Sequence, residues 1–220
     1  MASAVYWKRR LLRHLLLMFC AGLMVMAVYA MTPPPDFRHR ASMALAYAAL
    51  VYLLISLGLG PWNLLRGKPN PVSFDLRRDF GIWAAVLALL HTGVGLTVHL
   101  RGRMWMYFFK NLHPLQIQKN LFGFGNYTGL LAALLFVFLL AISNDLSLRS
   151  LGTSRWKRWQ QWTYVAVLLT LLHGIAYEVT EKRTLPWVVA GVLGVGAITA
   201  IQLAGVRRKM RAQTSEFRRS

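Results

Sequence analysis

Acidic residues and cysteine are both scarce in this sequence. Seven Asp and Glu stand against 26 Lys and Arg among 220 residues, which gives a formal net charge of +19. Because Cys20 has no second cysteine to join, an internal disulfide and a cysteine-based metal site are excluded. A G-x-G-x-x-G loop is also missing, so we expect no dinucleotide-binding domain.

Charge and hydrophobicity alternate along the chain in blocks. Hydrophobic residues make up 56% of the sequence, and they form uncharged runs close to the length of a membrane span. The basic residues lie between these runs and not along one face. This pattern is typical of a membrane protein whose loops carry positive charge, and not of a nucleic-acid-binding protein. We therefore expect the lipid bilayer, and no nucleic acid, as a partner.

The apolar runs predict an all-α membrane protein, a bundle of six transmembrane helices in a single domain over residues 1–220. A hydrocarbon core about 30 Å thick requires about 20 residues per helix. The predicted spans are residues 13–31, 41–60, 81–100, 127–144, 162–179 and 186–205. The longest predicted loop, residues 101–126, is rich in aromatic residues at its start and predicts an interfacial or re-entrant segment.

The loop charges predict the orientation of these spans. Of the 26 Lys and Arg, 18 fall on the side that holds the N-terminus, and 8 fall on the opposite side. The positive-inside rule then places both termini in the cytoplasm. We expect a multi-pass protein of the cytoplasmic (inner) membrane.

Two histidines lie in the middle of predicted spans that are otherwise uncharged there. His91 is 10 residues from the start of its span, and His173 is 11 residues from the start of its own. Both spans enter from the same side, so both side chains lie roughly 15–17 Å deep. An ionisable group at this depth is costly and usually has a partner and a function. Two level imidazoles suit the axial ligands of haem iron, so we predict one haem b bound by His91 and His173.

The residues around this pair leave other interpretations open. Gly93, Gly95 and Gly174 provide room for a flat macrocycle, or for close helix packing. The two histidines would also suit interhelical hydrogen bonds alone, or a proton relay. A relay normally includes buried carboxylates, whereas Glu178 lies near the outer end of its span.

The remaining histidines are weaker candidates. His99 lies near the outer end of the third span, where it could bond a haem propionate or simply stay at the interface. The equivalent position on the fifth span is Glu181, so a second bis-histidine haem there lacks a ligand. His14 belongs to the basic N-terminal cluster, and His39 and His113 are expected in loops.

Two motifs surround the mid-membrane histidines. The first reads Arg77-Arg78-Asp79-Phe80-Gly81-Ile82-Trp83 with Leu90-His91, and the second reads Arg155-Trp156-Lys157-Arg158-Trp159-Gln160 with Tyr164 and Leu172-His173. They resemble the ferric-reductase-like transmembrane domain family over residues 75–178. The nearest subgroup is the bacterial haem-binding membrane subunit of periplasmic methionine-sulfoxide reductase systems.

The resemblance implies an electron-transfer subunit of an oxidoreductase system, with no catalytic domain of its own. His91 and His173 match the family's haem-iron ligands. Electrons would come from a separate donor, a cytoplasmic flavin reductase or a quinol, and leave to a separate external reductase. Flavin and quinone are therefore further cofactor candidates.

The chain departs from the family pattern at Gln160. A histidine is expected there, and glutamine is a poor ligand for haem iron, so we predict one haem and not two. Arg77, Arg78 and Arg101 are candidates for propionate contacts, beside the alternative that they only set topology and bind lipid headgroups.

Two rival functions differ in their chemistry. A quinol-oxidising cytochrome b subunit of a larger respiratory complex would also use a bis-histidine haem, but would add a quinone site. A non-redox membrane protein would use the histidines structurally. If that non-redox protein were a transporter, its site would usually include broken helices. The fifth predicted span has no internal proline, which argues against a transporter.

Overall fold

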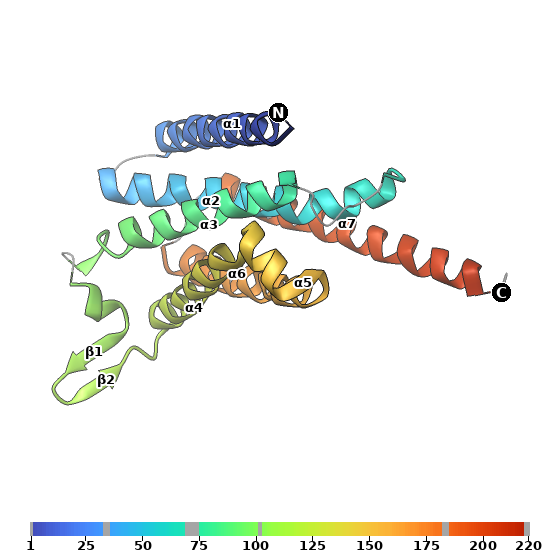
Figure 1. Ribbon diagram of the computed structural model, residues 1–220. Helices are drawn as coiled ribbons and strands as arrows, with labels where there is room; N and C mark the ends of the chain where they lie inside the picture. Colours follow the sequence, from blue (N-terminus) through green and yellow to red (C-terminus); the bar gives the residue numbers. More distant parts are fainter. Residues whose placement is uncertain (1, 33–35, 69–74, 101–102, 182–184, 218–220) are drawn as a thin grey trace.

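The computed structural model describes residues 2–32, 36–68, 75–100, 103–181 and 185–217 (Figure 1). Over these ranges the chain forms seven α-helices, a short 3₁₀-helix and one two-stranded antiparallel hairpin. The elements are α1 (Ala2–Met31), α2 (Phe37–Leu65), α3 (Asp75–Gly95), η2 (Met104–Tyr107), β1 (Phe109–Leu112), β2 (Leu115–Ile117), α4 (Leu121–Ile142), α5 (Asp145–Gln160), α6 (Trp162–Glu181) and α7 (Leu185–Phe217).

Five helical segments in the described ranges are long and apolar enough to cross a membrane: Tyr6–Met31, Phe37–Leu65, Leu121–Ile142, Asp145–Glu181 and Trp187–Arg211. The chain is therefore a multi-pass helical membrane protein. The third predicted span, which corresponds to α3, is not among the five. The first turns of α3 contain Arg77, Arg78 and Asp79, and these charges lower its hydropathy. The count of six spans stays a prediction.

Helix α3 also ends earlier than expected. The third span was predicted to reach residue 100, but the helix stops at Gly95 and the chain turns over residues 96–100. Leu100 has a φ of 59°, in the left-handed region, which a helix cannot contain. His99 is therefore on this turn and not on the helix.

Other boundaries differ where polar residues extend a helix beyond its apolar run. Helix α1 begins at Ala2, and α7 continues to Phe217 through a basic stretch. The expected loop between the fourth and fifth spans is itself helix α5, which is broken at Gly152 with a φ of 71°. The expected interfacial segment, residues 101–126, contains η2, the β1–β2 hairpin and the first turns of α4. This hairpin is a small exception to the all-α prediction.

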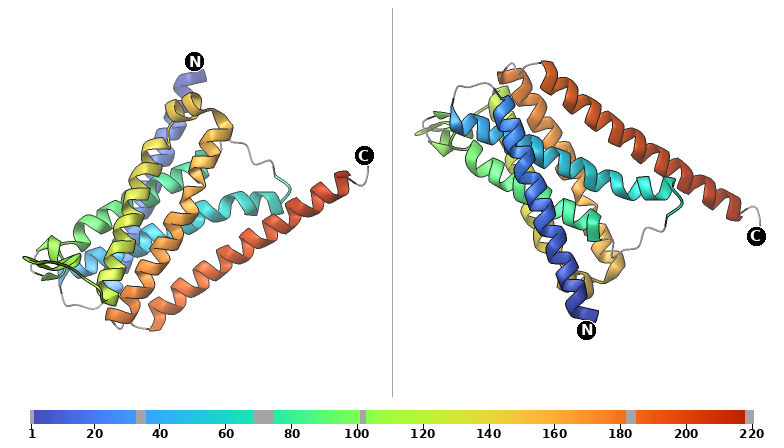
Figure 2. Two further views of the ribbon diagram at one scale, coloured as in Figure 1. Left: turned by 90° about the horizontal axis from the view of Figure 1, so that it is seen from below. Right: turned by 90° about the horizontal axis from the view of Figure 1, so that it is seen from above.

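Helix α2 lies at the centre of the packing. It packs mainly on α3 and also on α1 and α7, while α4 packs on α6 and α3 (Figure 2). Alanines at these contacts, such as Ala48, Ala84 and Ala166, are almost fully buried. Small side chains let helix backbones approach closely, which is how helices associate in lipid. Large apolar side chains such as Phe19 and Met26 instead point outward from α1.

The bundle has two distinct ends. At one end, which we call the hairpin end, the last turn of α1, the first turn of α2, residues 96–100, the hairpin and the last turn of α6 lie together (Figures 1 and 2). At the opposite end, Asp145 of α5 pairs with Arg78 of α3 at 2.6 Å and with Arg10 of α1 at 3.2 Å. Three of the segments predicted to share the N-terminal side are therefore close to one another: the N-terminal end, the start of α3 and the start of α5.

Candidate functional site

The imidazole rings of His91 and His173 lie side by side inside the bundle. His91 is near the C-terminal end of α3, and His173 is in the second half of α6. Their ring centroids are 6.0 Å apart, and the ring planes are inclined at 72°. The structure thus brings together the two residues that the depth argument singled out.

Both rings are oriented through the same nitrogen. Nδ1 of His91 lies 2.9 Å from the carbonyl oxygen of Ser42 and 3.1 Å from its Oγ. Nδ1 of His173 lies 2.8 Å from the carbonyl oxygen of Gly125. A carbonyl oxygen only accepts, so Nδ1 carries the proton in both neutral rings and donates it. Nε2 of each ring then holds the lone pair that binds a metal.

Helix α4 packs closely against the imidazole of His173. A Cβ at Gly129 would lie 2.5 Å from His173 Nδ1, and a Cβ at Gly125 would lie 3.1 Å from Ala176. Sequence analysis missed Ser42, Gly125 and Gly129. The Gly125-x-x-x-Gly129 spacing, which is common where membrane helices pack closely, was the available signal for the two glycines. Of the glycines noted from the sequence, Gly95 is close to the site, since a Cβ there would lie 3.3 Å from Ser42 Oγ and 3.9 Å from His91, whereas a Cβ at Gly93 or Gly174 would meet nothing within 4 Å.

A cavity of about 770 Å³ surrounds the two histidines. Its walls are largely apolar and come from α2, α3, α4, α6 and α7, with Leu50, Leu53, Phe136 and Val192 among the lining residues. This volume is within the range of cofactor sites in proteins. Imidazole nitrogens bind transition metals at about 2.0 Å, so one ion bonded to both rings would hold their centroids about 6 Å apart. The residues present therefore fit a haem with two histidine ligands.

A row of aromatic rings connects His173 with the hairpin end. The centroid of Tyr177 lies 4.8 Å from that of His173, and Phe122 lies 5.9 Å from Tyr177. Phe122 in turn lies 5.6 Å from Tyr107 and 6.1 Å from His99. These contacts form an unbroken path of π-systems from the middle of the bundle to its end.

Tyr107 fixes the turn that follows α3. Its side chain is 1% exposed, and its hydroxyl donates to the Gly95 carbonyl oxygen at 2.9 Å and accepts from the His99 N–H at 2.8 Å. Burial raises the pKa of the phenol above its usual value. The phenol therefore remains a donor throughout the physiological range, and it holds residues 96–100 in place.

The four candidates for propionate contacts lie in different places. Arg78 is paired with Asp145, and Arg77 is beside it, about 20 Å along α3 from His91. His99 is at the hairpin end, where its Nε2 lies 2.9 Å from Glu181 Oε1. Arg101 lies outside the described residues. Their role toward a haem stays a prediction.

Two further histidines have partners that the sequence did not indicate. His39 is not in a loop but in the first turn of α2, and it lies beside Glu181. His14 of α1 lies 3.3 Å from the fully buried Asp79 of α3, and it accepts a hydrogen bond from Trp83. These contacts depend on helix packing, which brings residues far apart in sequence together.

Gln160 and His113 are both remote from the histidine pair. Gln160 ends α5 at the opposite end of the bundle, where its side chain donates to Ser143 Oγ at 3.3 Å. His113 is exposed in the turn of the hairpin. Neither residue lines the cavity around His91 and His173.

Comparison with known proteins finds two relatives of this chain. The chain is 30% identical over 190 residues to the "Protein-methionine-sulfoxide reductase heme-binding subunit MsrQ" of Xanthomonas oryzae pv. oryzae strain MAFF 311018, covering 86% of this chain and 76% of the relative. The same protein of strain KACC10331 / KXO85 matches equally well. No family model matches the chain, and no solved structure matches it.

Proposed function

Because this chain belongs to the family of haem-binding subunits of protein-methionine-sulfoxide reductases, we propose that it binds one haem b between His91 and His173. We further propose that it carries electrons across the cytoplasmic membrane to a separate methionine-sulfoxide reductase. The observation that carries the first proposal is the pair of rings, 6.0 Å apart and both hydrogen-bonded through Nδ1. The departure at Gln160 weakened the assignment to the methionine-repair subgroup, but the similarity over 86% of the chain supports that assignment.

The residues of the chain define what the site would do. His91 and His173 would hold the haem iron through Nε2, and the two backbone carbonyls would keep the rings in the required tautomer. The apolar walls would exclude water, and with both imidazoles bound the iron would have little tendency to bind oxygen. Bound there, haem supplies a reversible one-electron carrier in the middle of the membrane.

The aromatic row supports an exit toward the hairpin end. Tyr177, Phe122 and Tyr107 would shorten the gaps that an electron must cross between His173 and the surface. With both termini in the cytoplasm, as the loop charges predict, the hairpin end faces outward. An external reductase would then accept electrons at this end, and a flavin reductase or a quinol would supply them from the other side.

The absorption spectrum of the purified protein tests the haem proposal. The dithionite-reduced minus oxidised spectrum should show the α band of a b-type haem. His91→Ala and His173→Ala should each abolish this band or greatly reduce it, whereas His113→Ala, which changes an exposed histidine in the hairpin, should leave it intact. A wild-type protein without the band, or a band that survives both substitutions, would refute the proposal.

A second measurement separates the two donors. A quinol analogue and a reduced flavin reductase are each added to the oxidised protein, and the growth of the α band is followed in time. Fast reduction by the quinol alone would identify a quinol as the donor, and fast reduction by the flavin reductase alone would exclude the quinol-oxidising alternative.

A further inference from the structure

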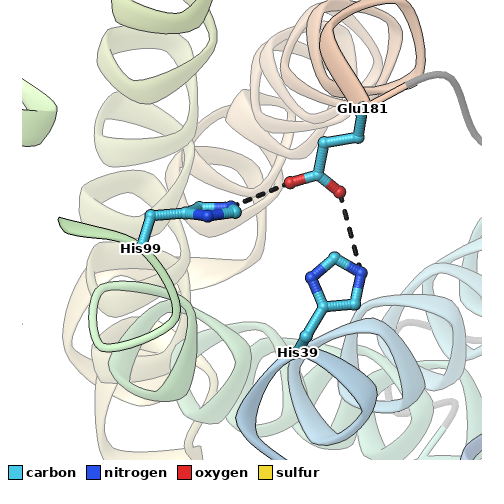
Figure 3. Close-up of side chains that lie close together, drawn as sticks. All are labelled: His39, His99 and Glu181. Carbon is cyan, nitrogen blue, oxygen red and sulfur yellow. Dashed lines mark hydrogen bonds and ion pairs between the residues drawn. The ribbon is translucent and has the colours of Figure 1, made fainter. Parts of the chain in front are cut away.

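Three metal-ligating side chains converge at the hairpin end. His39 comes from the first turn of α2, His99 from the turn after α3, and Glu181 is the last residue of α6 (Figure 3). Nε2 of His99 lies 2.9 Å from Glu181 Oε1, and Nε2 of His39 lies 3.9 Å from Glu181 Oε2. In Figure 3 both imidazoles point toward the carboxylate from different sides.

The ligand atoms are close enough for one ion. One nitrogen from each histidine and one carboxylate oxygen all lie within 4.8 Å of one another. Four-coordinate zinc bonds nitrogen and oxygen at about 2.0–2.2 Å, so its ligand atoms lie about 3.4 Å apart. The widest of these separations would therefore shorten by at most about 1.4 Å on binding.

The two arginines that lie next to His39 in the described part of the chain do not occupy the centre of the cluster. Arg38 and Arg40 flank His39 in the sequence, but their guanidinium groups bond elsewhere. Arg38 donates to the Thr97 carbonyl oxygen at 3.3 Å. Arg40 donates to the Tyr29 carbonyl oxygen at 2.8 Å, and its guanidinium lies 4.0 Å from the centroid of the Tyr29 ring. Each arginine is therefore held by a backbone acceptor.

Burial of the cluster is intermediate, which suits an ion that enters from solvent. The side chains of His99 and Glu181 are 36% and 16% exposed. All three residues line the same cavity as His91 and His173. An ion bound here would be partly desolvated, so each ligand would contribute more than it would on an open surface.

We propose that His39, His99 and Glu181 form a binding site for a divalent transition metal ion, Zn²⁺ above all. Two imidazoles and one carboxylate are a ligand set that Zn²⁺ prefers, and a fourth position is left for water or a partner's side chain. The ion would join α2, the turn after α3 and α6, and would close the hairpin end of the cavity. The proposal does not depend on haem, because none of its ligands is His91 or His173.

Zinc binding to the tag-free, haem-free protein in detergent tests this proposal. Isothermal titration should give one Zn²⁺ per chain, and saturating Zn²⁺ should raise the thermal unfolding midpoint. His39→Ala, His99→Ala and Glu181→Gln should each weaken binding at least tenfold. His113→Ala is the matched control, because it removes an exposed histidine outside the cluster, and it should bind as the wild type does.

The wild-type protein alone provides a second readout, which is needed if a variant fails to fold. X-ray absorption at the zinc edge of the loaded protein should show two imidazole ligands. Absence of saturable binding, fewer than two imidazoles, or an equal loss in His113→Ala would overturn the proposal. The cluster would then be a histidine–glutamate ion pair that only connects three segments.

Discussion

Gly129 of α4 lies directly against His173 of α6. A methyl group at this glycine would lie 2.5 Å from Nδ1, the atom that donates to the Gly125 carbonyl oxygen. The two helices therefore approach each other at the point where the imidazole must be oriented. Any side chain at residue 129 has to move the ring or separate the helices.

Gly129→Ala should therefore weaken haem binding more than it weakens the fold. Overpacking of this kind costs about 1–3 kcal/mol, which corresponds to a factor of about 5 to 150 in affinity. Haem retention per chain, measured by the pyridine haemochrome assay during detergent washing, checks this. Gly22→Ala in α1 is the control, since its methyl group meets nothing within 4 Å and should retain haem as the wild type does.

Tyr177→Leu should slow the delivery of electrons to an external acceptor several-fold. The substitution removes the ring that lies between His173 and Phe122, whereas Tyr177→Phe keeps that ring and loses the hydroxyl that donates to Asn126. Proteoliposomes with pre-reduced protein and a membrane-impermeant oxidant report the rate through decay of the α band. Equal rates in the leucine and phenylalanine variants would show that the electrons leave by another path.

Asp79→Asn should destabilise the bundle more than Asp145→Asn. Asp79 is fully buried and pairs with Arg13 at 2.5 Å, so its loss should cost about 2–4 kcal/mol, below the full range for buried pairs because Arg13 is 30% exposed. Asp145 is 36% exposed, and water screens its pairs, so about 1 kcal/mol is expected there. Thermal unfolding in detergent should show the larger drop for Asp79→Asn. The reverse order would mean that the pairing at α5 is the stronger connection between helices.

The ratio of haem to protein should be one. Gln160 lies at the end of α5, and its side chain bonds Ser143, so the position that carries a histidine in the family pattern offers no iron ligand here. Haemochrome and amino-acid analysis of the same sample measure the ratio. A ratio near two would mean that a second haem is held by residues other than Gln160.

Sequence patterns predicted the proximity of His91 and His173 better than the details around them. His91 and His173 were found because helical rise and span orientation fix depth, and depth does not depend on exact helix ends. The end of α3 was misplaced by five residues, since Tyr107 holds the turn after Gly95 through contacts made outside the helix. The convergence of His39 with Glu181 was also missed, because it depends on how helices far apart in sequence pack.

The groups that orient the two histidines could not be predicted from the sequence, for a different reason. Ser42 and Gly125 contribute carbonyl oxygens, and every residue has one, so side-chain chemistry gives no sign of the role. Only the Gly125-x-x-x-Gly129 spacing hinted that α4 comes close to another helix.

Orientation of the rings by main-chain oxygens has an evolutionary consequence. An amino-acid substitution at residue 42 or 125 does not delete the acceptor, provided that the helix keeps its path. The tautomer of each histidine is thus robust to sequence drift in α2 and α4, whereas changes that shift a helix axis would affect both the fold and the ligand at once. Homologous chains are free to vary at residue 42 as far as the carbonyl acceptor is concerned, and are constrained instead at the small residues that set the distance between helices, Gly125 and Gly129 among them.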